Sequence, residues 1–234
     1  MTGLLLLGFV ACGGTPRPTD PPHLRLPGTD RHDALALALD QLPNDTANEM
    51  WAIEAALAQN AVLSAYVATE DVLPVVLGAA FSGAGPLRDH LKDQGAAIAA
   101  RMQPLIGRAE FILHLLPLAS APAPFAPATG GAAFLRQRSA ARDLRRNLGC
   151  ERHDFAERAS SDLRSLAVAA VARSPKSGGP ILDVSLLVER TRTTALIERA
   201  RAVAEAATGF GLALRMIGPC APHSFTGREE RCDA

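Results

Sequence analysis

Two short motifs with the spacing Cys-x-x-His are the clearest arrangement of chemically active residues in this sequence. One runs from Cys150 to His153 and the other from Cys220 to His223. Two thiolates and two imidazoles can hold one zinc ion in a closed, tetrahedral structural site. Nothing in the sequence brings the two motifs together, because one lies in helix-forming sequence and the other in a proline-rich turn. We therefore predict no metal site and keep a zinc-stabilised binding module, built on both pairs, as the alternative function.

An arginine-rich stretch is the second candidate for binding chemistry. It contains Arg136, Arg138, Arg142, Arg145 and Arg146. The spacings of four and three place Arg138, Arg142 and Arg145 on one helix face, where they could follow the phosphates of a nucleic acid. No aromatic residues alternate with these arginines to stack on bases. We expect a solvated helix face or a contact for an acidic protein.

Motifs that support catalysis are missing from the sequence. It has neither the G-x-S-x-G pattern of a nucleophile elbow nor the G-x-x-x-x-G-K-[ST] pattern of a phosphate-binding loop. The six histidines form no H-x-x-x-H pair, and no pair of carboxylates stands out as acid and base. We therefore predict that the protein is not an enzyme, with no catalytic residue, no cofactor-binding residue and no cofactor.

The composition is that of a globular protein with protein partners. The chain has 234 residues, of which 48% are hydrophobic and 21% charged, and its 24 basic and 24 acidic residues give a formal net charge of zero. A neutral surface lacks the positive field expected of a nucleic-acid binder and makes self-association easier. Four cysteines are too few for a disulfide framework, so a reducing cytoplasm is expected.

The first apolar run, from Leu4 to Cys12, resembles an export signal only superficially. No positive charge precedes it, since Arg17 is the first basic residue. The run of about nine residues is also far shorter than the roughly 20 needed to span a bilayer. We predict a buried first strand and no lipid-membrane partner.

Elements that alternate between strand and helix are predicted for the first half. Strands are expected at 4–12, 34–39, 72–81 and 109–118, and helices from a cap at 44–46 to about Val67 and from 86 to about Met102. The alternation ALALAL at 34–39 has the strand period, although helix stays open there. In the first helix, Trp51 leads a stripe of small residues and is expected to anchor the core.

The second half has the same mixture of elements. Helix-forming sequence at 132–172 is interrupted near Gly149, and a strand at 181–190, a helix ending at Gly209 and a strand at 210–219 follow. The chain then enters GPCAPHSF, which we expect to turn and pack Phe225 on the C-terminal half. The sequence predicts an α+β fold with an N-terminal domain at 1–118, a Pro/Ala/Gly linker at 119–131 and a C-terminal domain at 132–234.

The order and rough spacing of five segments resemble the gas vesicle protein F/L family (GvpF/GvpL) over nearly the whole chain. The segments are VLPVVLGAAF (72–81), LIGRAEFILHL (105–115), AFLRQR (133–138), ILDVSLLVER (181–190) and GPCAPHSF (218–225). The family typically carries VLP-hydrophobic-R-F-G-T-x-F, G-R-x-E-W-G-x-K, Y-L-x-x-R and a closing G-P-W-P-P-Y-S-F. The resemblance therefore rests mainly on apolar and turn-forming positions.

The departures from the family pattern concern polar and aromatic positions. Val76 and Leu77 replace Arg-Phe, Phe111 and His114 replace Trp and Lys, Phe134 replaces Tyr, and Cys220, Ala221 and His223 replace Trp, Pro and Tyr. This chain therefore lacks the Arg and Lys side chains that the family carries at these positions. The closing segment retains Gly218, Pro219, Pro222, Ser224 and Phe225.

The resemblance implies a non-catalytic accessory protein of gas vesicles. It implies two α+β domains, the C-terminal one like a modified ferredoxin-like fold, and a role in vesicle formation as an assembly protein or minor component of the shell. The implied partners are the main shell protein GvpA and other accessory gas vesicle proteins, and the implied locations are the gas vesicle and the cytoplasm.

Overall fold

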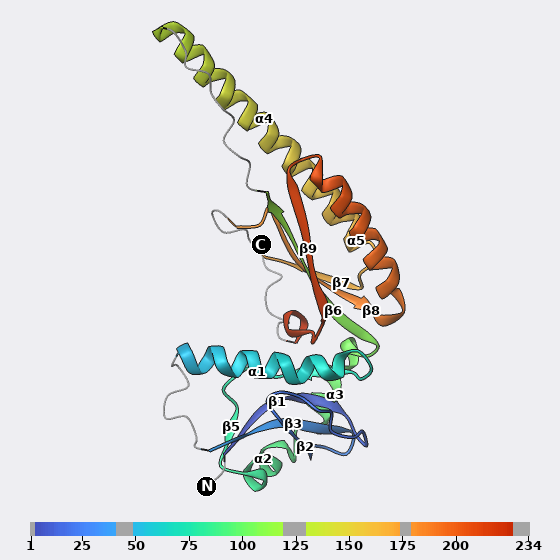
Figure 1. Ribbon diagram of the computed structural model, residues 1–234. Helices are drawn as coiled ribbons and strands as arrows, with labels where there is room; N and C mark the ends of the chain where they lie inside the picture. The colour runs from blue at the N-terminus through green and yellow to red at the C-terminus, as the bar shows by residue number, and fades with distance from the viewer. Residues whose placement is uncertain (1–2, 41–48, 119–129, 174–178, 227–234) are drawn as a thin grey trace. The chain divides into compact units, whose positions relative to one another are not determined.

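The computed structural model describes residues 3–40, 49–118, 130–173 and 179–226, and it has the α+β architecture that was predicted (Figure 1). Two antiparallel sheets carry the fold. The chain divides into two compact units: Met1–Phe111 with Leu187–Arg190 and Gly218–Ala234, and Ile112–Leu186 with Thr191–Ile217. Segments far apart in the sequence thus contribute to the first unit.

A sheet of five short strands forms the first unit. The strands are β1 (Gly3–Ala11), β2 (Leu24–Pro27), β3 (His32–Leu39), β4 (Val72–Pro74) and β5 (Ala80–Phe81). Their order is β2-β3-β1-β4, and β5 also pairs with β1. The predicted first strand is confirmed as β1, which is buried along almost its whole length. The alternating segment ALALAL is confirmed as a strand, β3.

An irregularity in β1 decides which of its side chains share a face. The pairing of β1 with β3 shifts between Leu6 and Gly8. After such a bulge the alternation of faces changes by one residue, which is why Leu6 and Phe9 contribute to the same apolar cluster. Gly8 is required at this point, since a Cβ there would lie 2.8 Å from the Leu73 carbonyl oxygen.

Helices cover both faces of this sheet. Figure 1 shows α1 (Glu49–Val67) on one face and α2 (Ala84–Leu91) on the other, and α3 (Gly95–Met102) and the 3₁₀ turn η1 (Gln103–Leu105) follow α2. The cluster on the α2 side contains Leu4, Leu6, Phe9, Ala34, Ala36, Leu73, Leu87, Leu91, Ile98, Met102, Leu105 and Leu187. On α1, Gln59 is buried and its Nε2 donates to the carbonyl oxygens of Leu7 (2.7 Å) and Val75 (2.9 Å). This side chain ties the helix to the sheet backbone.

Three predictions for the first unit need correction. The strand predicted at 72–81 is divided into β4 and β5, because the backbone turns at Gly78 with φ of +107°. The helix predicted from 86 to Met102 is divided into α2 and α3 by a turn at 92–94. No strand was predicted between 12 and 34, but β2 lies there, and its Leu24 and Leu26 pair with β3.

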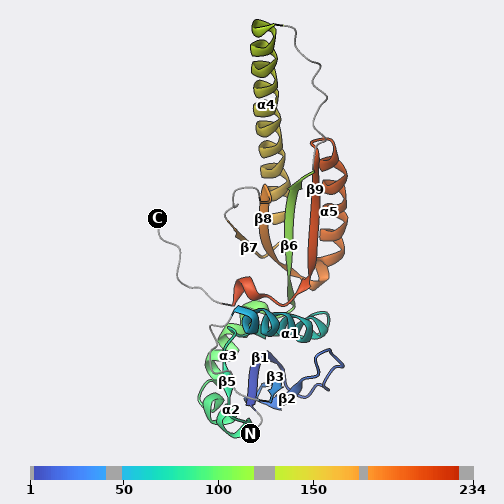
Figure 2. The ribbon, with the colours of Figure 1, turned by 60° about the vertical axis from the view of Figure 1, so that its left-hand side comes forward.

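The second sheet contains β6 (Arg108–Pro117), β7 (Ala169–Ala172), β8 (Leu182–Glu189) and β9 (Leu212–Cys220) in the order β7-β8-β6-β9. Figures 1 and 2 show α4 (Gly131–Arg164) and α5 (Thr193–Thr208) side by side on one face of this sheet. The 3₁₀ turns η2 (Arg190–Arg192) and η3 (His223–Phe225) follow β8 and β9. The elements follow one another along the chain as β6-α4-β7-β8-α5-β9.

Helix α4 contradicts the interruption predicted near Gly149. The helix runs without a break for 34 residues, and it ends at Arg164, so that 169–172 is a strand instead of helix. Glycine in a helix costs only about 1 kcal/mol relative to alanine, and packing just beyond it offsets that cost. Phe155 stacks on Phe210 with the ring centroids 4.7 Å apart, and Arg152 Nε donates to the Phe210 carbonyl oxygen at 2.7 Å.

Several predictions fall where the structure gives no description. The helix caps predicted at 44–46 lie outside the described residues. So does the linker at 119–131 except for Gly130, the N-cap residue of α4, and Gly131, its first residue. The division of the chain into domains at that linker stays a prediction. Among the described helices, none is both long enough and apolar enough to cross a membrane.

Candidate functional site

Residues within or beside three of the segments that resemble the family meet in the first unit, around Asp71. This carboxylate precedes β4 and accepts a hydrogen bond from the Gly107 amide at 2.8 Å and one from Arg190 Nη1 at 2.9 Å, with Arg190 Nη2 also in contact. The Arg190 amide in turn donates to the Gly107 carbonyl oxygen at 2.9 Å. Both charged side chains are about one-quarter exposed. The contacts therefore fasten the start of β6 and the end of β8 to the segment between α1 and β4.

A second set of hydrogen bonds joins β6 to the closing segment GPCAPHSF. Glu110 is only 1% exposed, and its carboxylate accepts hydrogen bonds from the Ser224 amide at 2.9 Å and from Ser224 Oγ at 2.6 Å. A buried carboxylate is costly unless hydrogen bonds replace its water. Ser224 supplies two of these bonds, which explains why this position belongs to the motif.

The glycine of the closing segment allows β9 to approach β6 closely. Gly218 has φ of +142°, and a Cβ at this position would lie 2.7 Å from Phe111 Cδ1 and 2.9 Å from the Glu110 carbonyl oxygen. Residues other than glycine rarely adopt such a φ. The contact thus needs glycine for both conformational and steric reasons.

Phe225 contradicts the prediction that it packs on the C-terminal half. It packs against the apolar cluster of the first unit that includes Leu4, Leu6 and Phe9. The turn η3 brings it there, and the Phe225 amide donates to the Pro222 carbonyl oxygen at 3.1 Å. The closing segment thus packs on a core to which β1 contributes.

Cys220 and His223, the second Cys-x-x-His pair, have environments that favour their neutral forms. Burial, and secondly the charge of Glu110, raises the pKa of the Cys220 thiol. Burial lowers the pKa of His223, although Glu110 acts in the opposite direction. A thiolate is the form that binds metal, and this environment disfavours it.

The first pair, Cys150 and His153, lies exposed on α4. Among the residues that the structure describes, no three His, Cys, Asp or Glu side chains are placed so that they could hold one metal ion. The geometry therefore gives no support to the alternative of a zinc-stabilised module.

The positions at which this chain departs from the family motifs differ in exposure, and two of them, Phe111 and Ala221, are buried. Val76 is 83% exposed and Phe134 is 50% exposed. His114, where the family has Lys, has its Nε2 atom 3.4 Å from Asp183 Oδ1. Arg138 Cζ lies 5.8 Å from the centre of the Phe134 ring. The departures thus affect both the surface, at Val76 and Phe134, and the interior, at Phe111.

Helix α1 presents an apolar surface that sequence analysis missed. Met50, Ile53 and Leu57 follow one another at spacings of three and four and are 65%, 48% and 66% exposed. Trp51 is only partly buried, so it is not the core anchor that was predicted. The sequence of α1 has apolar residues on more than one side of the helix, and this pattern could have predicted the surface, because it is typical of a helix with partners on more than one side.

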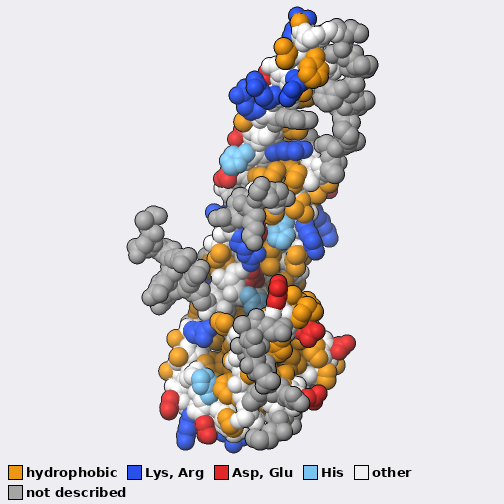
Figure 3. All heavy atoms as spheres, turned by 90° about the vertical axis from the view of Figure 1, so that its left-hand side faces the viewer, with side chains coloured by type: hydrophobic (Ala, Val, Ile, Leu, Met, Phe, Trp, Pro, Cys, Tyr) orange, Lys and Arg blue, Asp and Glu red, His pale blue; other side chains and the backbone are white. Residues whose placement is uncertain are grey.

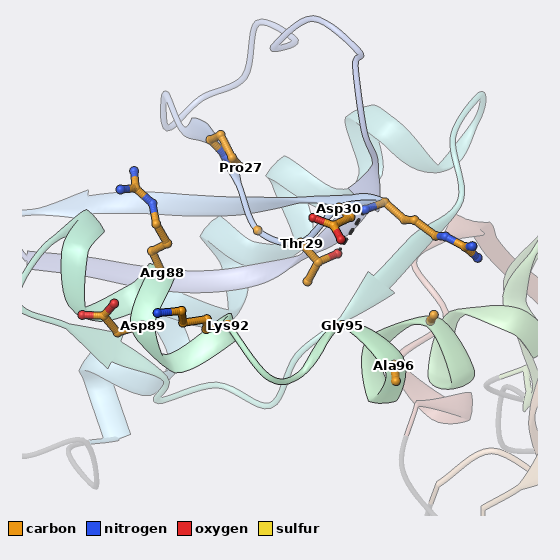
Figure 4. A pocket seen from close by; sticks show the side chains of 11 residues that line it. Pro27, Thr29, Asp30, Arg88, Asp89, Lys92, Gly95 and Ala96 are labelled. Carbon is orange, nitrogen blue, oxygen red and sulfur yellow. Dashed lines mark hydrogen bonds between the residues drawn. The ribbon is translucent and has the colours of Figure 1, made fainter.

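One open pocket lies in the first unit, between the loop after β2 and the helices α2 and α3 (Figure 4). It has a volume of about 680 Å³ and is lined by Pro27, Gly28, Thr29, Asp30, Arg31, Arg88, Asp89, Lys92, Gly95, Ala96 and Ala99. Figure 4 shows Asp30 beside Thr29, whereas Arg88 points away from both. Basic and acidic side chains both line the pocket, and they do not point to one common position. The pocket therefore indicates no particular class of ligand.

Comparison with known proteins finds the same family that the sequence segments resemble. A model of the family described as "Gas vesicle synthesis protein GvpL/GvpF" matches residues 28–227. The chain is similar to "Gas vesicle protein L" of Streptomyces sp. (strain CB03234), with 27% identity over 194 residues that cover 77% of this chain and 71% of that protein.

Two crystal structures share the fold. GvpF from Anabaena sp. PCC7120 superposes with a TM-score of 0.69 at 15% identity, covering 97% of both chains. GvpF from Microcystis aeruginosa superposes with a TM-score of 0.61 at 16% identity, covering 97% of this chain and 99% of that one. Because the family match spans most of the sequence and includes Asp71, Glu110 and Ser224, the chain belongs to the gas vesicle synthesis protein GvpL/GvpF family.

Proposed function

We propose that this protein takes part in gas vesicle formation by contacting the main shell protein GvpA, as an assembly protein or a minor component of the shell. Membership of the GvpL/GvpF family supports the process. The observation that carries the contact is the exposed apolar surface of α1, formed by Met50, Ile53 and Leu57.

The physical basis of the proposal is the protection of apolar surface before polymerisation. A shell that keeps water out needs subunits with a water-repelling face, and such a face aggregates while it is exposed. The α1 surface offers large side chains along one helix face, which suits the temporary covering of another apolar surface. Burial of apolar area contributes roughly 25 cal/mol per Å².

The remaining features of the proposal concern location, partners and chemistry. We place the protein in the gas vesicle and the cytoplasm, with other accessory gas vesicle proteins as further partners. The zero net charge of the chain supports protein partners over nucleic acid, and no lipid-membrane partner and no catalysed reaction form part of the proposed role.

The second sheet and its helices form, in this proposal, a modified ferredoxin-like fold. The order of elements β6-α4-β7-β8-α5-β9 supports it, since it is the β-α-β-β-α-β succession of that fold. The length of α4, 34 residues, is the modification.

Co-purification tests the contact with GvpA. The tagged protein is expressed with untagged GvpA, and the amount of GvpA retained is compared between wild type and the double variant Ile53→Glu/Leu57→Glu. The matched control is Val76→Glu/Ile106→Glu, which places the same charges on apolar side chains exposed elsewhere in the first unit. We expect the α1 variant to lose most of the retained GvpA and the control to keep it.

A strain in which the gene is deleted tests the role itself. We expect few or no gas-filled vesicles, with recovery by the wild-type gene and by the Val76→Glu/Ile106→Glu control. Normal vesicles in the deletion strain would show that the protein is not needed for vesicle formation.

A further inference from the structure

The first 20 residues of α4, Gly131–Cys150, form an arm whose described side chains are exposed or half-buried. None of its side chains with a described environment is buried, whereas the part of α4 after residue 150 buries Phe155, Ala156, Ala159 and Leu163. The turn after α5 supports this second part through Phe210, which stacks on Phe155. Helix α5 itself supports it through Arg199, whose Nη1 lies 3.1 Å from Asp162 Oδ1. At 1.5 Å per residue the arm is about 30 Å long.

The composition of the arm does not stabilise an isolated helix. It holds five arginines and one acidic residue, Asp143. Arg138, Arg142 and Arg146 follow one another at i, i+4, where like charges repel. The only ion pair found within the described arm joins Arg146 and Asp143 at 3.3 Å, with both side chains well exposed, and such pairs contribute at most about 1 kcal/mol. The N-cap residue Gly130 provides no side-chain cap.

Large apolar side chains stand among these arginines. Phe134 and Leu135 are 50% and 67% exposed. Phe134, Arg138, Arg142 and Arg146 are successive members of one i, i+4 row, and Leu135 lies next to its start. Figure 3 shows basic and hydrophobic side chains mixed along this part of α4, in the upper part of the view. We call Phe134, Leu135, Arg138, Arg142 and Arg146 the arm surface.

We propose that the arm surface is a docking site for an acidic protein segment that carries carboxylates together with apolar side chains. Carboxylates from the segment would pair with the row of arginines and remove their mutual repulsion. Its apolar side chains would cover Phe134 and Leu135. The site lies in a different unit from the α1 surface and does not depend on the contact with GvpA.

The mixing of side-chain types favours this partner over two others. A helix that binds a membrane surface separates its apolar face from its basic face, whereas the arm has both in one row. A nucleic acid would pair with the arginines, but its phosphates would leave Leu135 exposed and gain nothing from it. An acidic protein segment satisfies both kinds of side chain.

Binding of defined probes to the full-length protein tests the proposal. The probe is a fluorescent synthetic helix that presents glutamate and leucine on one face, and the comparison probes are the same peptide with glutamine for glutamate, a short DNA duplex and vesicles of phosphatidylglycerol. We expect the acidic peptide to bind, the glutamine peptide to bind at least about tenfold more weakly, and hydrogen exchange of amides 131–150 to slow on binding.

Two triple variants locate the site. Arg138→Glu/Arg142→Glu/Arg146→Glu should weaken binding of the acidic peptide at least about tenfold. Arg158→Glu/Arg164→Glu/Arg201→Glu changes the net charge equally at exposed arginines elsewhere in the second unit and should leave binding unchanged. Tighter binding of DNA or vesicles than of the acidic peptide, or equal losses in both variants, would overturn the proposal. Melting curves of both variants show that they are folded.

Discussion

His23 Nε2 lies 2.6 Å from Tyr66 Oη, and the neighbouring contacts decide which atom donates. Thr19 Oγ1 donates to the Pro21 carbonyl oxygen at 2.7 Å, so it accepts from His23 Nδ1–H at 2.8 Å. His23 Nε2 is then the acceptor for the Tyr66 hydroxyl, which itself accepts from the Arg17 amide at 3.1 Å. This series of hydrogen bonds requires neutral His23 and holds the loop between β1 and β2 against α1.

Stability should fall in mild acid because of His23. Burial, and secondly the charge of Arg25, lowers its pKa below the ordinary value of 6.5. The unfolded chain therefore binds the proton first, and the free energy of unfolding decreases as the pH falls below about 6.5 until the folded state also takes up the proton. Arg17, Arg25 and Glu70 are the charged groups around the site.

The variant His23→Gln removes this contribution. Urea denaturation between pH 5 and 8 should show a smaller dependence of stability on pH than in the wild type, with the residual slope including His32 and His223, whose pKa values are also lowered by burial. Identical slopes for the two proteins would contradict the assignment of His23 as a contributor.

Replacement of Ser224 should destabilise the first unit. Ser224→Ala removes the hydroxyl that donates to buried Glu110, and a hydrogen bond to a charged group contributes about 1.5–3 kcal/mol. Ser165→Ala is the control, because the hydrogen bond described for Ser165 Oγ goes to an exposed carbonyl oxygen, that of Asp162. Guanidinium denaturation should separate the two variants by about 1 kcal/mol or more; equal stabilities would show that Ser224 contributes no net bond energy.

Two glycines should respond to alanine in opposite directions. Gly218→Ala forces a Cβ against Phe111 and the Glu110 carbonyl oxygen at a positive φ, and we expect a loss of about 2–3 kcal/mol. Gly149→Ala meets no atom within 4 Å in the middle of α4 and should gain about 0.5–1 kcal/mol of helix stability. Thermal melting and circular dichroism measure both effects, and a stable Gly218→Ala variant would disprove the close approach of β9 to β6.

The contact of Arg190 with Asp71 should depend on the geometry of guanidinium. Arg190→Lys keeps the charge but loses the two-point contact with Asp71 Oδ1. We expect a loss of about 1–2 kcal/mol, and a larger one for Arg190→Met, which leaves Asp71 with the Gly107 amide alone among the contacts described above. If lysine and methionine are equally tolerated, the ion pair does not stabilise the fold.

The elements that sequence analysis placed correctly are those whose signal is local. Long apolar runs predicted β1, β6, β8 and β9, and helical spacing predicted α5 with its end at Gly209. Boundaries within apolar sequence were missed, as in the division of 72–81 at Gly78, because several conformations bury the same side chains equally well there. The motifs also led to the family that the comparison shows.

The hydrogen bonds around Asp71 and Glu110 could be found only in the tertiary structure. Asp71, Glu110 and Arg190 are charged residues beside or within apolar strands, and their sequence positions do not show that Glu110 pairs with Ser224, 114 residues away. Nor did the small-residue stripe of α1 show that its other side carries exposed Ile53 and Leu57.

The sequence by itself thus determined the α+β class, most strands and helices, and the family, because alternation, capping residues and glycine positions act over a few residues. Only the tertiary structure decided where the closing segment packs. Phe225 packs on the cluster that contains residues of β1, and not on the C-terminal half. The place where Phe225 packs depends on how β9 pairs with strands far away in the sequence, and local sequence patterns do not encode such pairing.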